Sequence, residues 1–206
     1  MKALLLTLAL ALTMSPALAA PVARGSDEAA ALRAFPEVKG EILKSAPYAD
    51  RGERHVVILT QEDYPSRPNK DDPDFICGNA DVRAYGYNLA GASGPVWRMH
   101  DYVHDCETSA TAEFSPDSPL VTDVDGNGLA EVWLVYYISC HGDVSPDGMK
   151  ILMYEGGKKH ALRGETFVHV DGQDMGGTYT ADPAMRAAPQ AIRRYADQLW
   201  QEHKQR

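Results

Sequence analysis

One nine-residue segment constrains the fold of this chain more than any other. Residues 123–131 read Asp-Val-Asp-Gly-Asn-Gly-Leu-Ala-Glu, with oxygen-bearing side chains at loop positions 1, 3, 5 and 9. The flanking segments 120–122 and 132–138 are rich in β-branched and aromatic residues, which favour strands. The segment is therefore predicted to be a loop between two strands. It is not an EF-hand loop, because position 12 is Leu134 instead of a carboxylate.

The alternation of oxygens in this loop also predicts a site for a hard cation. Ca²⁺ takes about six to eight oxygen ligands on a curled backbone, and glycines at 126 and 128 permit the curl. We expect one structural Ca²⁺ with a dissociation constant on the order of 10⁻⁴–10⁻³ M, as in extracellular modules. The alternative is an Asn-Gly hairpin whose acids are only solvated. The expected ligands are Asp123, Asp125, Asn127, the carbonyl of Leu129, and Glu131.

The first nineteen residues have the pattern of an export signal. Lys2 precedes an apolar run from residue 3 to 14, and Ala17-Leu18-Ala19 fits the small-x-small cleavage rule. We expect residues 1–19 to be a signal peptide and residues 20–206 to form one secreted domain, periplasmic or extracellular. No stretch is long enough to span a membrane. The net charge of −9 argues against nucleic acid as a partner.

Three cysteines in an oxidising compartment predict one disulfide and one free thiol. In an antiparallel meander, the strand ends that carry Cys77, Cys106 and Cys140 meet at the sheet edge opposite the acidic loop. We expect the pair Cys106–Cys140, with Cys77–Cys106 as the alternative. No Cys-x-x-Cys spacing supports a zinc site.

The remaining pattern predicts an α+β fold, with a mostly antiparallel meandering β-sheet, a C-terminal helix packed on it and a short N-terminal helical segment. Residues 26–44 are expected to be helical, 54–60 to be a strand and 64–73 to be a loop. Hairpins are expected at 82–89 with 95–104, and at 149–154 with 159–163. Asp182 and Pro183 are typical of a helix start, and apolar residues then recur at helical spacing to Leu199.

Two groups of residues are candidates for a functional site, one for zinc binding and one for serine hydrolase catalysis. His100 and His104 lie on one face of a predicted strand and are candidate zinc ligands, although such histidines are more often hydrogen-bonded sheet residues. A serine hydrolase would combine Ser145 with His141 and Asp143. Because no Gly-x-Ser-x-Gly elbow is present, a turn closed by an Asp143 side-chain bond explains this segment better.

Several acids are candidates for the carboxylate pair of a glycoside hydrolase, but the sequence does not fix their separation. These acids are Glu107, Glu113, Asp117, Glu155 and Glu165. Catalytic residues therefore stay unassigned.

From about residue 95 to 202, the sequence resembles a family of small secreted bacterial proteins whose name links it to surface polysaccharide biosynthesis. The matching segments are 123–131, 140–146 with Lys150, Met153 and Glu155, then 159–164, 176–182 and 195–200. The acidic loop by itself is also similar to the Asp-x-Asp-Gly-x-Gly-x-x-Asp/Glu loops of FG-GAP propeller blades. The family resemblance implies an envelope setting and supplies no catalytic residues.

These patterns together favour a non-catalytic envelope accessory protein with one calcium-stabilised hairpin, whose partner is an envelope protein or a glycan. The first alternative is an enzyme that acts on cell-surface glycans through acidic residues. The second is a protein-interaction module that uses Trp97, Trp133 or an exposed sheet edge.

Overall fold

The computed structural model describes residue 35 and residues 37–69, 72, 74, 76–91 and 94–205. Most of these residues form antiparallel strands, and two helices lie near the C-terminus, so the predicted α+β class is confirmed. The expected signal peptide and residues 26–34 of the expected N-terminal helix lie outside the described residues.

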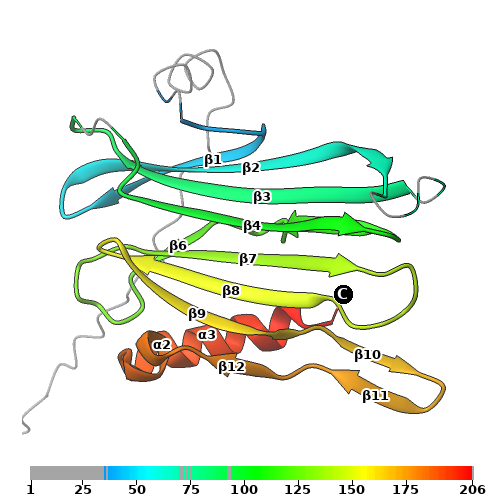
Figure 1. Ribbon diagram of the computed structural model, residues 1–206. Helices are drawn as coiled ribbons and strands as arrows, with labels where there is room; N and C mark the ends of the chain where they lie inside the picture. The colour runs from blue at the N-terminus through cyan, green and yellow to red at the C-terminus, as the bar shows by residue number, and fades with distance from the viewer. Residues whose placement is uncertain are drawn as a thin grey trace, which may run out of the picture.

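The first four strands form one antiparallel sheet in the order β1-β2-β3-β4 (Figure 1). They are β1 (Glu41–Asp50), β2 (Glu53–Pro68), β3 (Ile76–Asn88) and β4 (Trp97–Cys106). The hairpin predicted around residues 90–94 is confirmed as β3–β4.

Two local predictions in this first sheet are wrong. Residues 41–44 belong to β1 and are not helical, and residues 64–68 belong to β2 and are not a loop. The helix was expected from the start signals Ser26, Asp27 and Glu28, and the loop from the three prolines within residues 64–73. Pro47 is tolerated in β1 because β1 is an edge strand. In β2, the pairing register with β3 shifts between Tyr64 and Arg67, where the chain contains Pro65.

The later strands form a second antiparallel sheet, in the order β12-β9-β8-β7-β5, with β6 also paired to β7. They are β5 (Ala110–Phe114), β6 (Leu120–Thr122), β7 (Glu131–Cys140), β8 (Gly148–Glu155), β9 (Lys158–Glu165) and β12 (Tyr179–Ala181). The two strands predicted to flank the acidic loop are β6 and β7, and they pair. The predicted β8–β9 hairpin is also confirmed, with positive φ at Gly156 and Gly157. Strands β10 (Phe167–Val170) and β11 (Gln173–Gly176) form a separate ribbon that projects beyond this sheet (Figure 1).

The strands therefore do not form one continuous meander. Strand β4 belongs to the first sheet and β7 to the second, and the two sheets share a core. Val57, Leu59 and Val82 of the first sheet pack in one cluster with Leu134 and Leu152 of the second. All five side chains are buried. Burial of apolar surface between the sheets provides the main force that holds them together.

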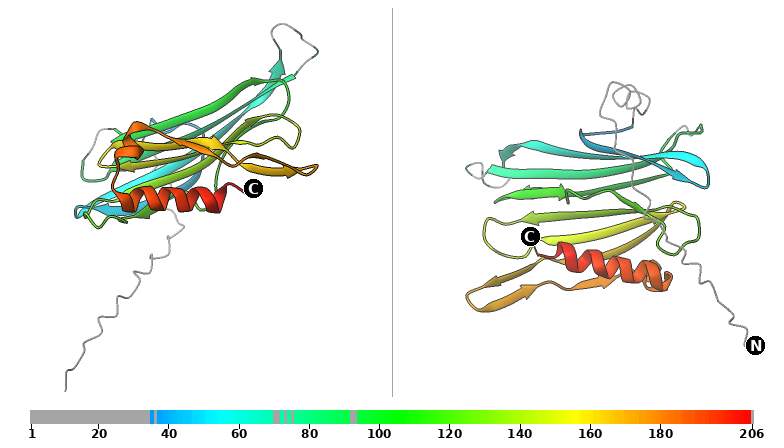
Figure 2. Two further views of the ribbon diagram at one scale, coloured as in Figure 1. Left: turned by 90° about the horizontal axis from the view of Figure 1, so that it is seen from below. Right: turned by 180° about the vertical axis from the view of Figure 1, so that it is seen from behind.

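Helices α2 (Pro183–Ala187) and α3 (Gln190–His203) cover the other face of the second sheet (Figure 2). The predicted helix start is confirmed, because the Asp182 carboxylate accepts a hydrogen bond from Met185 N at 2.7 Å. Pro189 divides the predicted single helix into two, since proline cannot continue the hydrogen-bonding pattern of α2. Trp200 of α3 is fully buried against the second sheet.

A disulfide between Cys106 and Cys140 ties the end of β4 to the end of β7, as expected. Cys77 is a buried free thiol, and the neighbouring Gly78 pairs with Cys106. The three cysteines thus gather at one end of the fold. Within the described part of the chain, no helix is long and apolar enough to cross a membrane.

Candidate functional site

The acidic loop is tightly curled by hydrogen bonds from its own backbone. Asp123 accepts from Gly128 N at 3.1 Å, Asp125 accepts from Asn127 N at 3.1 Å, and Asn127 accepts from Leu129 N at 2.7 Å. Gly128 has φ +80°, which L-residues with a side chain rarely adopt. These bonds curl the backbone between Asp123 and Leu129.

Glu131 anchors the loop to the second sheet. Its side chain is fully buried, and its carboxylate accepts hydrogen bonds from Val124 N at 2.9 Å and from Thr122 Oγ1 at 2.6 Å. Thr122 in turn accepts from Trp133 Nε1 at 2.8 Å. The carboxylate is therefore held rigidly under the loop by groups of β6, β7 and the loop itself.

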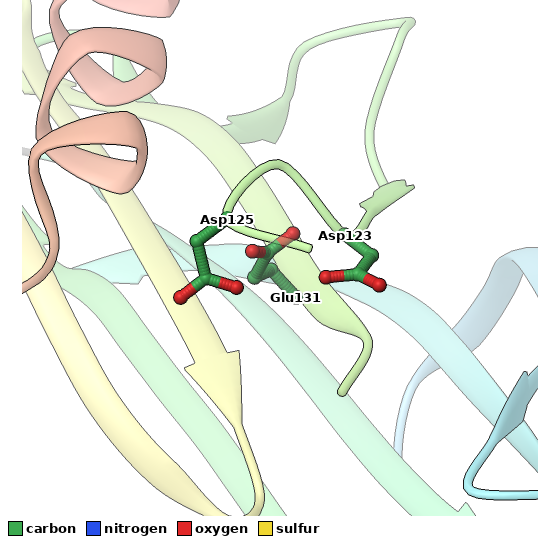
Figure 3. A group of neighbouring side chains, drawn as sticks. All are labelled: Asp123, Asp125 and Glu131. Atoms are coloured by element: carbon green, nitrogen blue, oxygen red, sulfur yellow. The ribbon is translucent and has the colours of Figure 1, made fainter. Parts of the chain in front are cut away.

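Glu131 lies between Asp123 and Asp125 (Figure 3), and one carboxylate oxygen from each of the three lies within 4.8 Å of the others. Asp123 is exposed and Asp125 is half-buried, so the group opens to solvent on one side. Among the described residues, no Lys, Arg or His lies within ion-pair distance of these carboxylates. Asn127 lies beside them, where its Nδ2 donates to Glu155 at 2.8 Å. The arrangement can accept a cation coordinated by oxygen.

A second polar cluster lies on the outer face of the first sheet, and it adds Asp81, Arg83 and Glu62 to the two histidines considered from the sequence. His100 Nε2 and His104 Nε2 lie 2.5 and 2.7 Å from the two carboxylate oxygens of Asp81. Arg83 donates to the same carboxylate at 2.6 Å and to Glu62 at 2.8 Å. Asp81 pairs with Tyr102 across the β3–β4 ladder, which places it between the two histidines. Only this register, which the sequence does not specify, could have identified Asp81.

Asp81 is ionised in the folded protein, and its charge sets the direction of the hydrogen bonds in the cluster. Burial raises the pKa of this carboxyl group, but hydrogen bonds from His100 and His104 and the charge of Arg83 outweigh burial, so its pKa lies below the ordinary value of 3.8. An ionised carboxylate only accepts hydrogen bonds, so His100 and His104 each donate Nε2–H to Asp81. Asp101 faces the opposite side, where it accepts from Tyr136 and Lys150.

This cluster is not a zinc site of three converging ligands. Among the described residues, the acidic loop is the only group in which three possible ligand atoms lie within 4.8 Å of one another. Both imidazoles instead share a buried carboxylate, which agrees with the alternative of hydrogen-bonded sheet residues.

The predicted turn at residues 140–146 is confirmed. Asp143 accepts a hydrogen bond from Ser145 N at 3.0 Å, and His141 lies 3.4 Å from the same carboxylate. The bond to Ser145 N closes the turn that the sequence predicts.

The proposal that a partner binds Trp97 or Trp133 is wrong, because both side chains are buried: Trp97 is 8% and Trp133 0% exposed. Trp97 stacks on Tyr154 in the shared core, with ring centroids 4.1 Å apart.

A polar groove of about 410 Å³ lies between β2, β3, β5 and the short segment that leads into β5. Asp63 and Glu113 line it, together with Asn79, whose Nδ2 has no hydrogen-bond partner among the described groups. Of the five acids considered from the sequence, only Glu113 belongs to this groove, and Asp63 was not considered. Glu155 lies at the acidic loop, and Glu107 accepts a hydrogen bond from Asn69.

Comparisons with known proteins give no relative for this chain: no family model, no curated protein and no solved structure matches it. The resemblances inferred from the sequence therefore stay hypotheses.

Proposed function

We propose that this is a non-catalytic accessory or binding protein of the bacterial cell envelope, in which one structural Ca²⁺ holds the 123–131 loop. One observation carries the calcium proposal. Glu131 is fully buried beside Asp123 and Asp125, and the described residues supply these three carboxylates with no basic partner. A buried carboxylate without a compensating charge is costly, so a bound cation would stabilise the loop.

The chemistry of the loop favours a hard cation such as Ca²⁺ over zinc and copper. Only oxygen atoms are available from Asp123, Asp125 and Glu131, and hard cations prefer such ligands, whereas zinc and copper prefer nitrogen and sulfur. The metal has a structural role in this proposal, because the site lies in a β6–β7 hairpin and the second sheet supports it from below. The envelope setting is supported by the Cys106–Cys140 disulfide, since disulfides persist in oxidising compartments.

Calcium binding should raise the thermal stability of the protein. With a dissociation constant on the order of 10⁻⁴–10⁻³ M, 10 mM Ca²⁺ stabilises the folded state by about 1.4–2.7 kcal/mol. For a domain of this size, we expect the melting temperature to rise by about 3–11 °C over that measured in chelator. Differential scanning calorimetry with and without calcium, together with isothermal titration, measures both quantities.

Two variants separate binding in the loop from nonspecific charge effects. Asp125→Ala should abolish the calcium-dependent rise, because it removes one of the three converging carboxylates. Asp174→Ala removes the same charge from the β10–β11 ribbon and should retain the full rise. An unchanged wild-type melting temperature and no binding heat would leave only a solvated Asn-Gly hairpin.

The polar groove favours a second candidate function, an enzyme that acts on cell-surface glycans. Its lining combines two carboxylates, Asp63 and Glu113, with an unpartnered amide donor from Asn79. Glycoside hydrolysis requires such a pair, one carboxyl group as general acid and one as base or nucleophile.

Reducing-end release from isolated envelope polysaccharide tests this candidate. Asp63→Asn and Glu113→Gln should each lower the rate by about 10²-fold or more, as expected for loss of an acid–base group. Glu107→Gln, which changes an acid outside the groove lining, serves as the matched control. If the wild-type protein releases no reducing ends, or both groove variants retain full activity, the enzyme candidate is rejected.

A further inference from the structure

A pocket of about 330 Å³ lies where the two C-terminal helices meet the edge of the second sheet. Leu162 of β9 and Met185 of α2 are buried and provide an apolar floor. Ala181 and Tyr179 of β12 form one wall. This volume is at the lower end of the range of about 300–1,000 Å³ that is typical of small-molecule sites.

Two arginines stand at this apolar pocket. Arg186 comes from α2 and Arg193 from the first turn of α3, and both side chains are exposed. Within the described part of the chain, neither guanidinium forms an ion pair with a carboxylate. This is notable in a protein of net charge −9, where acids outnumber basic residues. Arginine carries a planar set of donors that suits carboxylate and phosphate groups.

The nearby acids are already engaged by other groups. Asp182 caps α2 by accepting from Met185 N at 2.7 Å. Asp197 accepts from the Tyr179 hydroxyl at 2.9 Å. Neither carboxylate forms an ion pair with Arg186 or Arg193, so the positive charge at the pocket is not neutralised from within the fold.

The start of α3 adds to this positive charge. The helix begins after Pro189 without a side-chain cap, and its first turn contains no acidic residue. The first backbone N–H groups of a helix carry partial positive charge, which favours anions. Arg193 lies in this first turn and lines the pocket.

We propose that this pocket binds a small amphipathic anion, in which an oxyanion group contacts Arg186 and Arg193 and an apolar body lies over Leu162 and Met185. The floor excludes a strongly hydrated ligand, because transfer of polar groups onto an apolar surface is unfavourable. The two guanidiniums favour a ligand with an oxyanion group over a neutral hydrocarbon, since a hydrocarbon offers no acceptor to their donors. A molecule with an oxyanion group and an apolar body matches both the two arginines and the apolar floor of the pocket.

Titration of the full-length mature protein with three probes tests the proposal. Octanoate carries both parts, acetate has the carboxylate alone, and 1-octanol has the chain without charge. We expect octanoate to bind at least about 10-fold more tightly than either of the others, with chemical-shift changes at Leu162, Tyr179 and Met185. Equal affinity for acetate and octanoate, or for octanol and octanoate, would overturn the proposal.

Substitution of each arginine locates the anion. Arg193→Gln and Arg186→Gln should each weaken octanoate binding by roughly 10-fold or more, which corresponds to loss of a charge-assisted hydrogen bond. Arg194→Gln is the matched control, because Arg194 adjoins Arg193 on α3 but does not line the pocket. Arg186 also donates to the Ala181 carbonyl, so the Arg193 variant provides the test that does not depend on this internal contact.

The pocket is independent of the acidic loop. The calcium-loop variant Asp125→Ala should bind octanoate with wild-type affinity, so failure of the calcium proposal leaves this one unaffected. Wild-type octanoate affinity in both Arg186→Gln and Arg193→Gln would show that the arginines do not hold the anion and would reject the site.

Discussion

Asp81→Ala should lower the free energy of unfolding by about 3–5 kcal/mol, the effect expected when one partner of a buried charge pair is removed. The Asp81 side chain is only 1% exposed and that of Arg83 only 9%, so the guanidinium would stay buried without its closest carboxylate. His100 and His104 would also lose their shared acceptor. Chemical denaturation at neutral pH measures the change.

The pH dependence of unfolding should identify Asp81 as a source of acid sensitivity. The groups that face it are Glu62 and Tyr64 of β2, Arg83 of β3, and His100 and His104 of β4. Because the pKa of Asp81 is lowered in the folded state, its contribution is fully present above the unfolded value of about 3.9. That contribution is lost as the pH falls through the lower, folded-state pKa.

The stability difference between wild type and Asp81→Ala should therefore shrink as the pH is lowered below about 4. Asp63→Ala, an exposed acid at the end of the same sheet, should change stability by less than about 0.5 kcal/mol at neutral pH. A loss below about 1 kcal/mol for Asp81→Ala, or a difference that does not vary with pH, would show that the cluster does not stabilise the fold.

Removal of the disulfide should be the other large effect. Cys106 and Cys140 are 34 residues apart, and closure of a loop of that length corresponds to roughly 4 kcal/mol of unfolded-state entropy. We expect the double variant Cys106→Ala, Cys140→Ala to lose about 2–4 kcal/mol and to melt about 4–16 °C lower. The bond joins the ends of one strand from each sheet, so its loss should also loosen contacts between the sheets.

Reduction provides the internal control for this prediction. A reducing agent should lower the melting temperature of the wild-type protein toward that of the double variant and should leave the variant unchanged. Thiol titration of the unfolded, oxidised wild type should find one free thiol, that of Cys77. Three free thiols in protein purified without reductant, or equal stability of wild type and variant, would contradict the prediction.

Local sequence patterns determined several elements correctly. The acidic loop between β6 and β7 follows from its alternation of oxygens and glycines, and the β8–β9 turn follows from Gly156-Gly157. Asp182 and Pro183 marked the start of a helix. Strand alternation brought the three cysteines to one edge but did not choose between Cys106–Cys140, the preferred pair, and Cys77–Cys106; the structure has the preferred pair. Each of these depends on interactions between residues close in sequence, or on simple strand alternation.

Only the tertiary structure decided how the strands divide and what they bring together. Sheet membership depends on which apolar faces pack against each other, so a meander pattern did not reveal two sheets with a shared core. The Asp81 cluster depends on the register of β3 against β4, and a shift of one residue would place its side chain on the other face. The arginine pocket joins β9, β12, α2 and α3, which lie side by side only in the folded chain. Residue spacing sets local geometry, whereas the burial of distant apolar surfaces sets these long-range positions.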